Sequence, residues 1–207
     1  MMEEELNPKR LKENEAEKDG WRRDLYDWLQ LLVIVLVIVV GLFTFVVGVV
    51  RVDGLSMYPT LNDGDLMLVQ RLGYKPEQGD VVVLRKDNAF QNRAIVKRVI
   101  ATGGQEVYID YGTNTVTVDG VVLDEPYLNY EEDRTYGDDF LDIRYDLDPQ
   151  YINQTFVVPE GCIFVCGDNR NHSSDSRVAE LGMVDERYVI GGVMMIVFPF
   201  QDAGIVH

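Results

Sequence analysis

Ser56 and Lys97 are the two residues whose types and surroundings could perform nucleophilic catalysis. Ser56 lies in a turn-rich run, Asp53-Gly-Leu-Ser-Met-Tyr-Pro-Thr-Leu61, and Lys97 lies in an apolar run, Val96-Lys-Arg-Val-Ile100. A serine nucleophile needs a neighbouring base that is unprotonated near neutral pH. A lysine that points into a core loses solvation, so its pKa falls toward that range. Successive strand residues face opposite sides, so we expect Arg98 to point to solvent while Lys97 points inward.

A third stretch of polar residues could support such a pair. The loop Gly167-Asp-Asn-Arg-Asn-His-Ser-Ser-Asp-Ser-Arg177 follows the apolar run Cys162–Cys166. Its side chains could brace an active site, or they could be hydrated in an ordinary surface loop. Histidine is a poorer candidate base here. His207 is the terminal residue, and we interpret His172 as a polar residue of the loop.

Four runs resemble, in the same order, the motifs of bacterial type I signal peptidases (leader peptidases), which are membrane-anchored serine proteases that remove signal peptides. They are Ser56-Met-Tyr-Pro-Thr-Leu, Gly79-Asp-Val-Val, Lys97-Arg-Val-Ile and Gly167-Asp-Asn-Arg-x-x-Ser-x-Asp-Ser-Arg. Asp53-Gly-Leu-Ser is similar to the Gram-positive branch, where glycine stands two residues before the nucleophile. Relatives of the archaeal and endoplasmic-reticulum type have histidine where this chain has lysine.

The resemblance implies roles for five residues. Ser56 would be the nucleophile and Lys97 the general base of a Ser-Lys dyad. Ser173 would hydrogen-bond the lysine amine and orient it. Asp175 and Arg177 would form an ion pair that holds the loop in place.

The resemblance also implies how substrate is bound, and it implies no cofactor and no metal. The Ser56 backbone N–H would bind the oxyanion, whereas Gly54 lacks the hydroxyl that other branches contribute. The family's preprotein substrates carry small side chains at the third and first residues before the cut. We place Val52, Ile95 and Val96 in the walls of the pocket that receives them.

The elements that must position these residues begin with an apolar segment. Residues Leu31 to Val50 contain no charge, and a helix needs about 20 such residues to cross the hydrocarbon core of a bilayer. No small-x-small cleavage site follows, so we expect a retained anchor rather than a signal peptide. The predicted organisation is a tail at 1–29, a transmembrane helix at 30–50 and an outer domain at 51–207.

Basic residues flank the apolar segment unequally, which predicts its orientation. Lysine and arginine accumulate on the cytoplasmic side, so the N-terminus is predicted to be cytoplasmic and residues 51–207 extracytoplasmic, at a cell membrane. The first 20 residues are polar and are predicted to be disordered. The bases before the segment are Lys9, Arg10, Lys12, Lys18, Arg22 and Arg23, and only Arg51 follows closely.

The outer domain is predicted to be mainly β, with antiparallel sheets like those of signal peptidases. Short β-branched runs bounded by Gly, Pro and Asp predict strands, and Asp119-Gly120 predicts a hairpin. An acidic insertion at about 124–154 interrupts the strands, and we expect a solvated face. Cys162 and Cys166 would lie about 13 Å apart on one strand, too far for a disulfide. The predicted strands are 66–70, 81–85, 94–100, 115–123, 156–158, 162–166 and 193–198.

Charge and composition exclude some functions. The 35 acidic and 19 basic residues give a formal charge of −16, which disfavours nucleic acid as a partner. Two histidines and two cysteines leave little for a metal site. The expected partners are preprotein signal peptides and the lipid bilayer. Two alternatives stay open: a protease dedicated to one substrate, and a non-catalytic anchored domain that binds partners through its acidic insertion.

Overall fold

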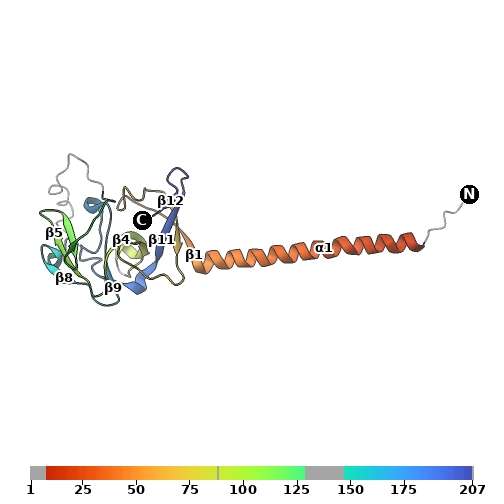
Figure 1. The fold of residues 1–207 in the computed structure, drawn as a ribbon, viewed down its shortest axis with the longest axis horizontal. Coiled ribbons are helices and arrows are strands. Elements are labelled where there is room, and N and C mark those ends of the chain that lie inside the picture. The colour runs from red at the N-terminus through yellow and green to blue at the C-terminus, as the bar shows by residue number, and fades with distance from the viewer. Residues whose placement is uncertain (1–7, 88, 129–146, 207) are drawn as a thin grey trace, which may run out of the picture. The chain divides into compact units, whose positions relative to one another are not determined.

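The computed structural model describes residues 8–87, 89–128 and 147–206. These residues fall into two compact units, an N-terminal unit up to Phe45 and a β unit that begins at Val46 (Figure 1). The chemistry-bearing residues predicted above all belong to the β unit.

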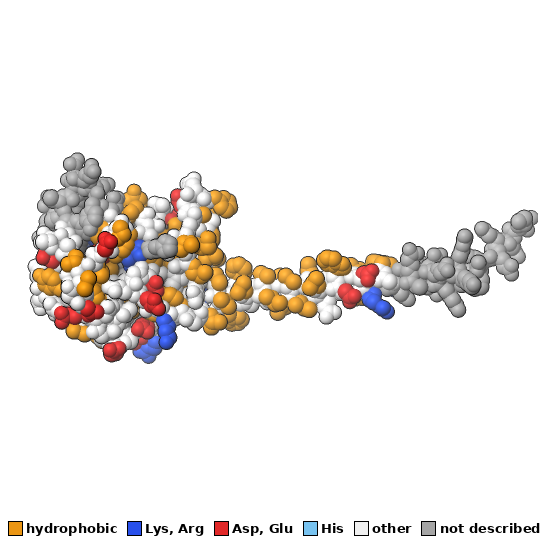
Figure 2. Space-filling model, in the orientation of Figure 1, with side chains coloured by type: hydrophobic (Ala, Val, Ile, Leu, Met, Phe, Trp, Pro, Cys, Tyr) orange, Lys and Arg blue, Asp and Glu red, His pale blue; other side chains and the backbone are white. Residues whose placement is uncertain are grey.

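The N-terminal unit is helical. Helix α1 spans Pro8–Gly41, and a π-helical stretch, Leu42–Val46, continues it. The segment Gly20–Val46 is long and apolar enough to cross a membrane, and Figure 2 shows apolar side chains along it. The described residues therefore include one N-terminal apolar helix that is consistent with a single-pass anchor.

The helix differs from the sequence prediction at both ends. It begins at Pro8, within the segment expected to be disordered, because proline suits a first helical position and the Lys, Leu, Glu and Ala that follow favour helix. The helical segment ends at Val46 rather than Val50, because the β-branched run Val47–Arg51 forms a strand that pairs with Leu66–Gln70. Residues 1–7 lie outside the described part of the chain.

The larger sheet of the β unit has eight strands in antiparallel pairs. The strand order is β1-β2-β11-β3-β4-β9-β10, and β12 pairs with β11. The sheet places β4, which carries Lys97, between β3 and β9. The strands are β1 (Val47–Arg51), β2 (Leu66–Gln70), β3 (Val81–Leu84), β4 (Ile95–Thr102), β9 (Cys162–Cys166), β10 (Val184–Asp185), β11 (Val189–Phe198) and β12 (Gly204–Ile205).

The smaller sheet has four antiparallel strands in the order β7-β6-β5-β8. The Asp119-Gly120 turn joins two of them, as the sequence predicts. A core of aliphatic and aromatic side chains lies between this sheet and strands β4 and β9. The strands are β5 (Glu106–Asp110), β6 (Thr115–Val118), β7 (Val121–Val122) and β8 (Thr155–Val157), and 3₁₀ turns lie at Phe90–Asn92, Pro149–Tyr151, Arg170–His172 and Glu186–Tyr188.

Strand β4 is buried on both faces, which corrects one sequence prediction. Five consecutive residues from Lys97 to Ala101 are buried. Arg98 was expected to face water, but it is 1% exposed and pairs with Asp168. A strand covered on both faces offers no solvated side, so alternation does not apply to it.

The acidic segment 124–154 is not wholly a solvated insertion. Its two described ends pack onto the β unit: Glu125, Leu128, Leu147 and Tyr151 are all buried. Leu147 also forms a β-bridge with Val178, next to the polar loop. Residues 129–146 lie outside the described part of the chain, so the prediction for them stays a prediction.

Candidate active site

Ser56 lies in the turn between β1 and β2. Apolar neighbours fix this turn: Met57 and Leu61 are buried in the core, and the Leu61 N–H donates to the Met57 carbonyl at 2.9 Å. Gly54 has a φ of +101°, a conformation that glycine adopts without steric cost. The turn therefore holds Ser56 half-buried on an anchored backbone.

Lys97 reaches the serine from β4. Its side chain is 3% exposed, and its Nζ donates to the Ser56 Oγ at 2.8 Å and to the Val96 carbonyl at 2.9 Å. Burial lowers the pKa of Lys97 to about 8, although the charge of Asp175 acts in the opposite direction. About one amine in ten is then neutral at pH 7, against fewer than about one in 10³ for an ordinary lysine.

The ion pair expected between Asp175 and Arg177 is present and buried. Arg177 Nε lies 2.8 Å from Asp175 Oδ1, and both side chains are at most 1% exposed. The other carboxylate oxygen accepts a hydrogen bond from the Gly167 N–H at 3.0 Å. Burial opposes ionisation of Asp175, but the Arg177 charge and these hydrogen bonds hold its pKa below the usual range. The pair fixes the beginning and the end of the polar loop to each other.

Ser173 is buried close to Ser56, but the expected hydrogen bond to Lys97 is not among the contacts of the described residues. Its Oγ finds no partner there at hydrogen-bonding geometry, although the hydroxyl lies near enough to Asp175 to help lower the pKa of that carboxyl. The amine of Lys97 donates to Ser56 and Val96 instead. An orienting role for Ser173 therefore stays a prediction.

Two residues of the polar loop that sequence reasoning did not single out hold Ser56 directly. The Asn169 N–H donates to the Ser56 carbonyl at 3.0 Å, and the Asn169 side-chain amide donates to the Leu55 carbonyl at 3.1 Å. A Cβ at Gly167 would lie 2.3 Å from Ser173 Oγ and 2.4 Å from the Ser56 carbonyl oxygen. Only glycine lets the backbone at position 167 come so close to Ser56 and Ser173. The available sequence signal for Gly167 was its position in the polar loop after a buried strand.

Arg98 and Asp168 form a second buried pair that sequence reasoning missed. Arg98 Nε and Nη2 donate to the two carboxylate oxygens of Asp168 at 2.8 and 2.7 Å. Asp168 also accepts a hydrogen bond from the Thr60 hydroxyl. This bidentate pair joins β4, the polar loop and the end of the Ser56 turn. Asp168 comes two residues after the end of the buried strand β9, and this position was the available signal for it.

A cavity of about 310 Å³ opens beside Ser56 and Lys97. Val52, Ile95 and Val96, predicted from the sequence as pocket residues, all line it. Phe90 also lines it, and the backbone of Phe90–Asn92 has positive φ throughout. The other lining residues are Val50, Arg51, Asp53, Met57, Arg93, Ala94 and Ser174.

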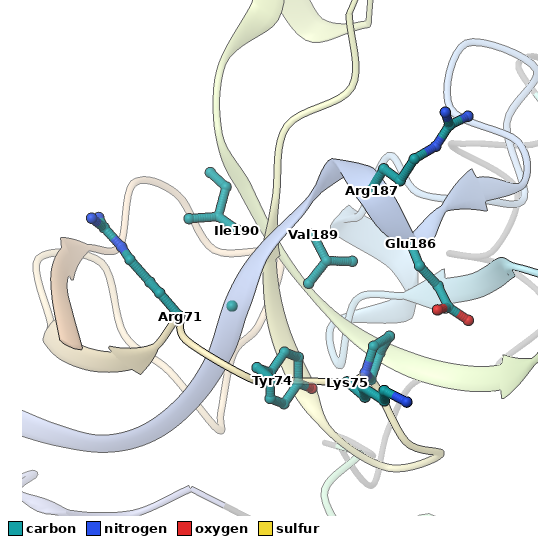
Figure 3. Close-up of a pocket in the computed structure, with 9 residues that line it drawn as sticks. Arg71, Tyr74, Lys75, Glu186, Arg187, Val189 and Ile190 are labelled. Carbon is teal, nitrogen blue, oxygen red and sulfur yellow. The ribbon is translucent and has the colours of Figure 1, made fainter. Parts of the chain in front are cut away.

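A second cavity, of about 200 Å³, is lined by none of these site residues (Figure 3). Tyr74 and Lys75 line it together with Val189 and Ile190 of β11. The Tyr74 hydroxyl donates to Asp80 at 2.7 Å, so this ring is fixed.

The described residues contain no group of three or more His, Cys, Asp or Glu side chains that could hold a metal ion. Both cysteines are free thiols.

Comparison with known proteins assigns this chain to a family. Residues 25–198 match the family described as "Signal peptidase, peptidase S26". Signal peptidase IB of Staphylococcus aureus is 36% identical over 185 residues, which cover 87% of this chain and 93% of that protein. Signal peptidase I of Bacillus licheniformis is 32% identical over 193 residues, which cover 91% of this chain and 96% of that protein.

Among solved structures, this chain is similar to a signal peptidase I from Enterococcus faecalis V583. The two are 27% identical, with a TM-score of 0.37, and the match covers 57% of this chain and 96% of the other.

Proposed function

The chain belongs to the signal peptidase family, peptidase S26, and on that premise we propose that Ser56 and Lys97 form the catalytic dyad of a membrane-anchored enzyme. Family membership makes it a serine peptidase that cleaves signal peptides from preproteins. The observation that carries the proposal is the 2.8 Å contact between Lys97 Nζ and Ser56 Oγ, made by an amine whose burial lowers its pKa to about 8.

The first chemical step is acylation. The neutral Lys97 amine accepts the Ser56 hydroxyl proton while Oγ attacks the scissile carbonyl carbon. The Ser56 backbone N–H stabilises the oxyanion of the tetrahedral intermediate. When that intermediate collapses, the peptide C–N bond breaks and the Lys97 ammonium gives its proton to the leaving amine. The signal peptide is left as an ester on Ser56.

Deacylation repeats the sequence with water. The water oxygen attacks the ester carbonyl while Lys97 accepts a proton from the water. When the ester bond breaks, Lys97 returns a proton to Ser56 Oγ. The buried Asp175–Arg177 pair supports both steps because it keeps the polar loop against Ser56. Ser173 lies in the same loop and is buried. We propose that its hydroxyl orients the Lys97 amine.

The cavity beside the dyad supports a preference for small substrate side chains. Its walls include Val52, Ile95 and Val96, and a volume of about 310 Å³ must hold both a stretch of substrate backbone and its side chains. Small residues at the third and first positions before the cut fit this space. The substrate would bind in an extended conformation, as peptides added to sheet edges do.

The apolar helix supports a membrane anchor, with a cytoplasmic N-terminal tail and an extracytoplasmic β unit. Ser56 follows the end of the helical segment at Val46 by ten residues, which extend to at most about 35 Å. A dyad tethered at this distance meets chains that emerge at the membrane surface. A signal peptide whose apolar region is held in the bilayer presents its cleavage site there, so the anchor selects the substrate by position.

The experiment that tests this function uses the full-length protein purified in detergent. It is incubated with a preprotein, and the new N-terminus of the product is sequenced. We expect one cut after a small residue, and no cut with Ser56→Ala. Cleavage by Ser56→Ala at the wild-type rate, or cuts scattered along the mature region, would contradict the proposal.

A further inference from the structure

Glu125 is a buried carboxylate at the beginning of the segment that the sequence presents as an acidic insertion. It is 8% exposed, and it accepts hydrogen bonds from both Nη atoms of Arg170 and from the Tyr127 hydroxyl. Buried carboxylates with this many partners are fixed in place, since each partner compensates for lost hydration. A residue of a merely solvated acidic face would make no such contacts.

Arg170, the partner of Glu125, belongs to the polar loop and fixes its backbone. Its Nε donates to the Gly167 carbonyl at 3.1 Å. Its own carbonyl accepts a hydrogen bond from Arg177 Nη2 at 2.8 Å. Arg170 therefore connects the first residue of the loop with the Asp175–Arg177 ion pair at the end of it.

The backbone that Arg170 fixes is the backbone that touches Ser56. Gly167 lies against both Ser173 Oγ and the Ser56 carbonyl oxygen, and Asn169 donates to that same oxygen. A displacement of the loop near Gly167 would therefore be transmitted to Ser56, and the 2.8 Å contact between Ser56 and Lys97 depends on where Ser56 lies.

Tyr127 gives the same segment a second contact with the site. Its hydroxyl donates to Glu125 at 2.8 Å, and its ring lies 3.8 Å from the guanidinium carbon of Arg98, the residue that follows Lys97 on β4. The segment Glu125-Pro-Tyr127 thus contacts both the polar loop, through Arg170, and the strand of the proposed base, through Arg98.

We propose that Glu125 is a positioning residue for cleavage: it holds Arg170, and through it the Gly167–Asn169 backbone that sets the distance between Ser56 and Lys97. This inference rests on the proposed function of those two residues. Tyr127 assists by orienting the Glu125 carboxylate. The described beginning of the acidic segment is then part of the catalytic framework, whatever residues 129–146 contribute.

The test compares Glu125→Gln with Asp124→Asn in the full-length detergent-purified protein. Both changes remove one negative charge, but Asp124 is exposed and the change there should leave cleavage unaltered. For Glu125→Gln we expect kcat per titrated active site to fall at least about tenfold, with KM within about twofold. The pH at half-maximal activity should stay unchanged, because Glu125 and Arg170 contact each other and the loop backbone, whereas the Lys97 amine donates to Ser56 and Val96.

A double-variant comparison separates positioning from general destabilisation. If Glu125 acts through Arg170, Glu125→Gln should cost little more in kcat when Arg170→Gln is already present, whereas independent structural roles would give multiplying losses. Tyr127→Phe is the milder variant should Glu125→Gln not fold. It keeps the ring over Arg98, loses only the hydroxyl, and should lower kcat about threefold with KM unchanged.

The outcomes are distinct. Wild-type kcat in both Glu125→Gln and Tyr127→Phe would overturn the positioning role while leaving the Ser-Lys proposal intact. The positioning role would also be overturned if the losses of kcat in the two single variants multiplied in the double variant. It would likewise be overturned if the loss of activity disappeared when rates are expressed per active site. Failure of the wild-type protein and of Asp124→Asn to cleave any preprotein would instead contradict the proposed function itself.

Discussion

Lys97 and Arg98 are consecutive buried residues of β4, and within the described part of the chain Arg98 alone of the two is paired with a carboxylate. Arg98 donates to both oxygens of Asp168, whereas Lys97 has no acidic side chain within ion-pair distance among the described residues. An arginine stays protonated in any such setting, but a lysine in an apolar site shifts its pKa. The strand therefore places an ion-paired arginine beside a lysine whose pKa burial lowers to about 8, as the proposed base requires.

The first prediction concerns the base. Lys97→Arg should lower preprotein turnover at least about 10³-fold, because a guanidinium stays charged and cannot accept the Ser56 proton. Adding Ser56→Ala should cost little more, because the two residues act as a unit. The measurement is single-turnover cleavage, with Lys75→Arg, an exposed lysine outside the site, as the matched control. Near wild-type turnover by Lys97→Arg would show that Lys97 is not the base.

The second prediction is the pH dependence of activity. Burial lowers the pKa of Lys97 from 10.5 to about 8. Activity should therefore rise about tenfold per pH unit below pH 8 and level off above it, as the amine loses its proton. Single-turnover rates between pH 6 and 9.5 give the profile. A rate independent of pH over this range, in a protein that stays folded, would contradict a lysine base.

The same shift makes a prediction about stability. Between about pH 8 and 10.5 the unfolded chain still holds the Lys97 proton while the folded protein does not, so raising the pH favours folding. The free energy of unfolding should gain about 3 kcal/mol from this group across that window and nothing below it. Denaturant titrations at several pH values should show that the free energy of unfolding rises with pH more steeply in wild type than in Lys97→Met. Equal pH dependence in the two proteins would show that the Lys97 amine stays protonated in the folded state.

The sequence predicts those parts of the structure that depend on residues close together in the chain better than those that depend on distant partners. Strands β2 and β9 begin and end where the β-branched runs predict, and the Asp119-Gly120 turn forms as expected. Residues 47–50 were assigned to the membrane helix because apolar β-branched residues suit both a bilayer and a strand. Only their pairing with Leu66–Gln70 decides between the two, and that partner is distant in sequence.

The site shows the same division. The contact between Ser56 and Lys97 and the Asp175–Arg177 ion pair join residues that short motifs already single out. The Arg98–Asp168 pair and the Glu125–Arg170 pair join residues 70 and 45 positions apart, so neither spacing nor composition reveals them. Acidic composition suggested solvation for Glu125, but a buried arginine from the loop compensates its charge. Buried ion pairs of this kind become visible only when the fold brings the partners together.

Gly167 gives a prediction that tests the close approach in the polar loop. Gly167→Ala would place a Cβ 2.3 Å from Ser173 Oγ and 2.4 Å from the Ser56 carbonyl oxygen, so the polar loop and the Ser56 backbone must shift relative to each other. We expect kcat to fall at least about 10²-fold, because small displacements of a nucleophile are costly. Gly112→Ala, where the nearest atom is a side-chain oxygen at 3.2 Å, is the control. Wild-type kcat in Gly167→Ala would contradict this packing.

The last prediction is the orientation in the membrane. Six lysines and arginines precede the uncharged apolar segment that begins at Leu31 and one follows it closely, and such bases stay on the cytoplasmic side. Protease added to spheroplasts should therefore digest the β unit and spare an N-terminal tag, whereas lysis should expose the tag as well. The orientation also decides which substrates the β unit can reach. A β unit held outside meets a preprotein only after the cleavage site has reached the outer surface, and a cut there releases the mature chain. Digestion of the tag in intact spheroplasts, with the β unit protected, would reverse the orientation and leave the dyad on the side where exported chains have not yet emerged.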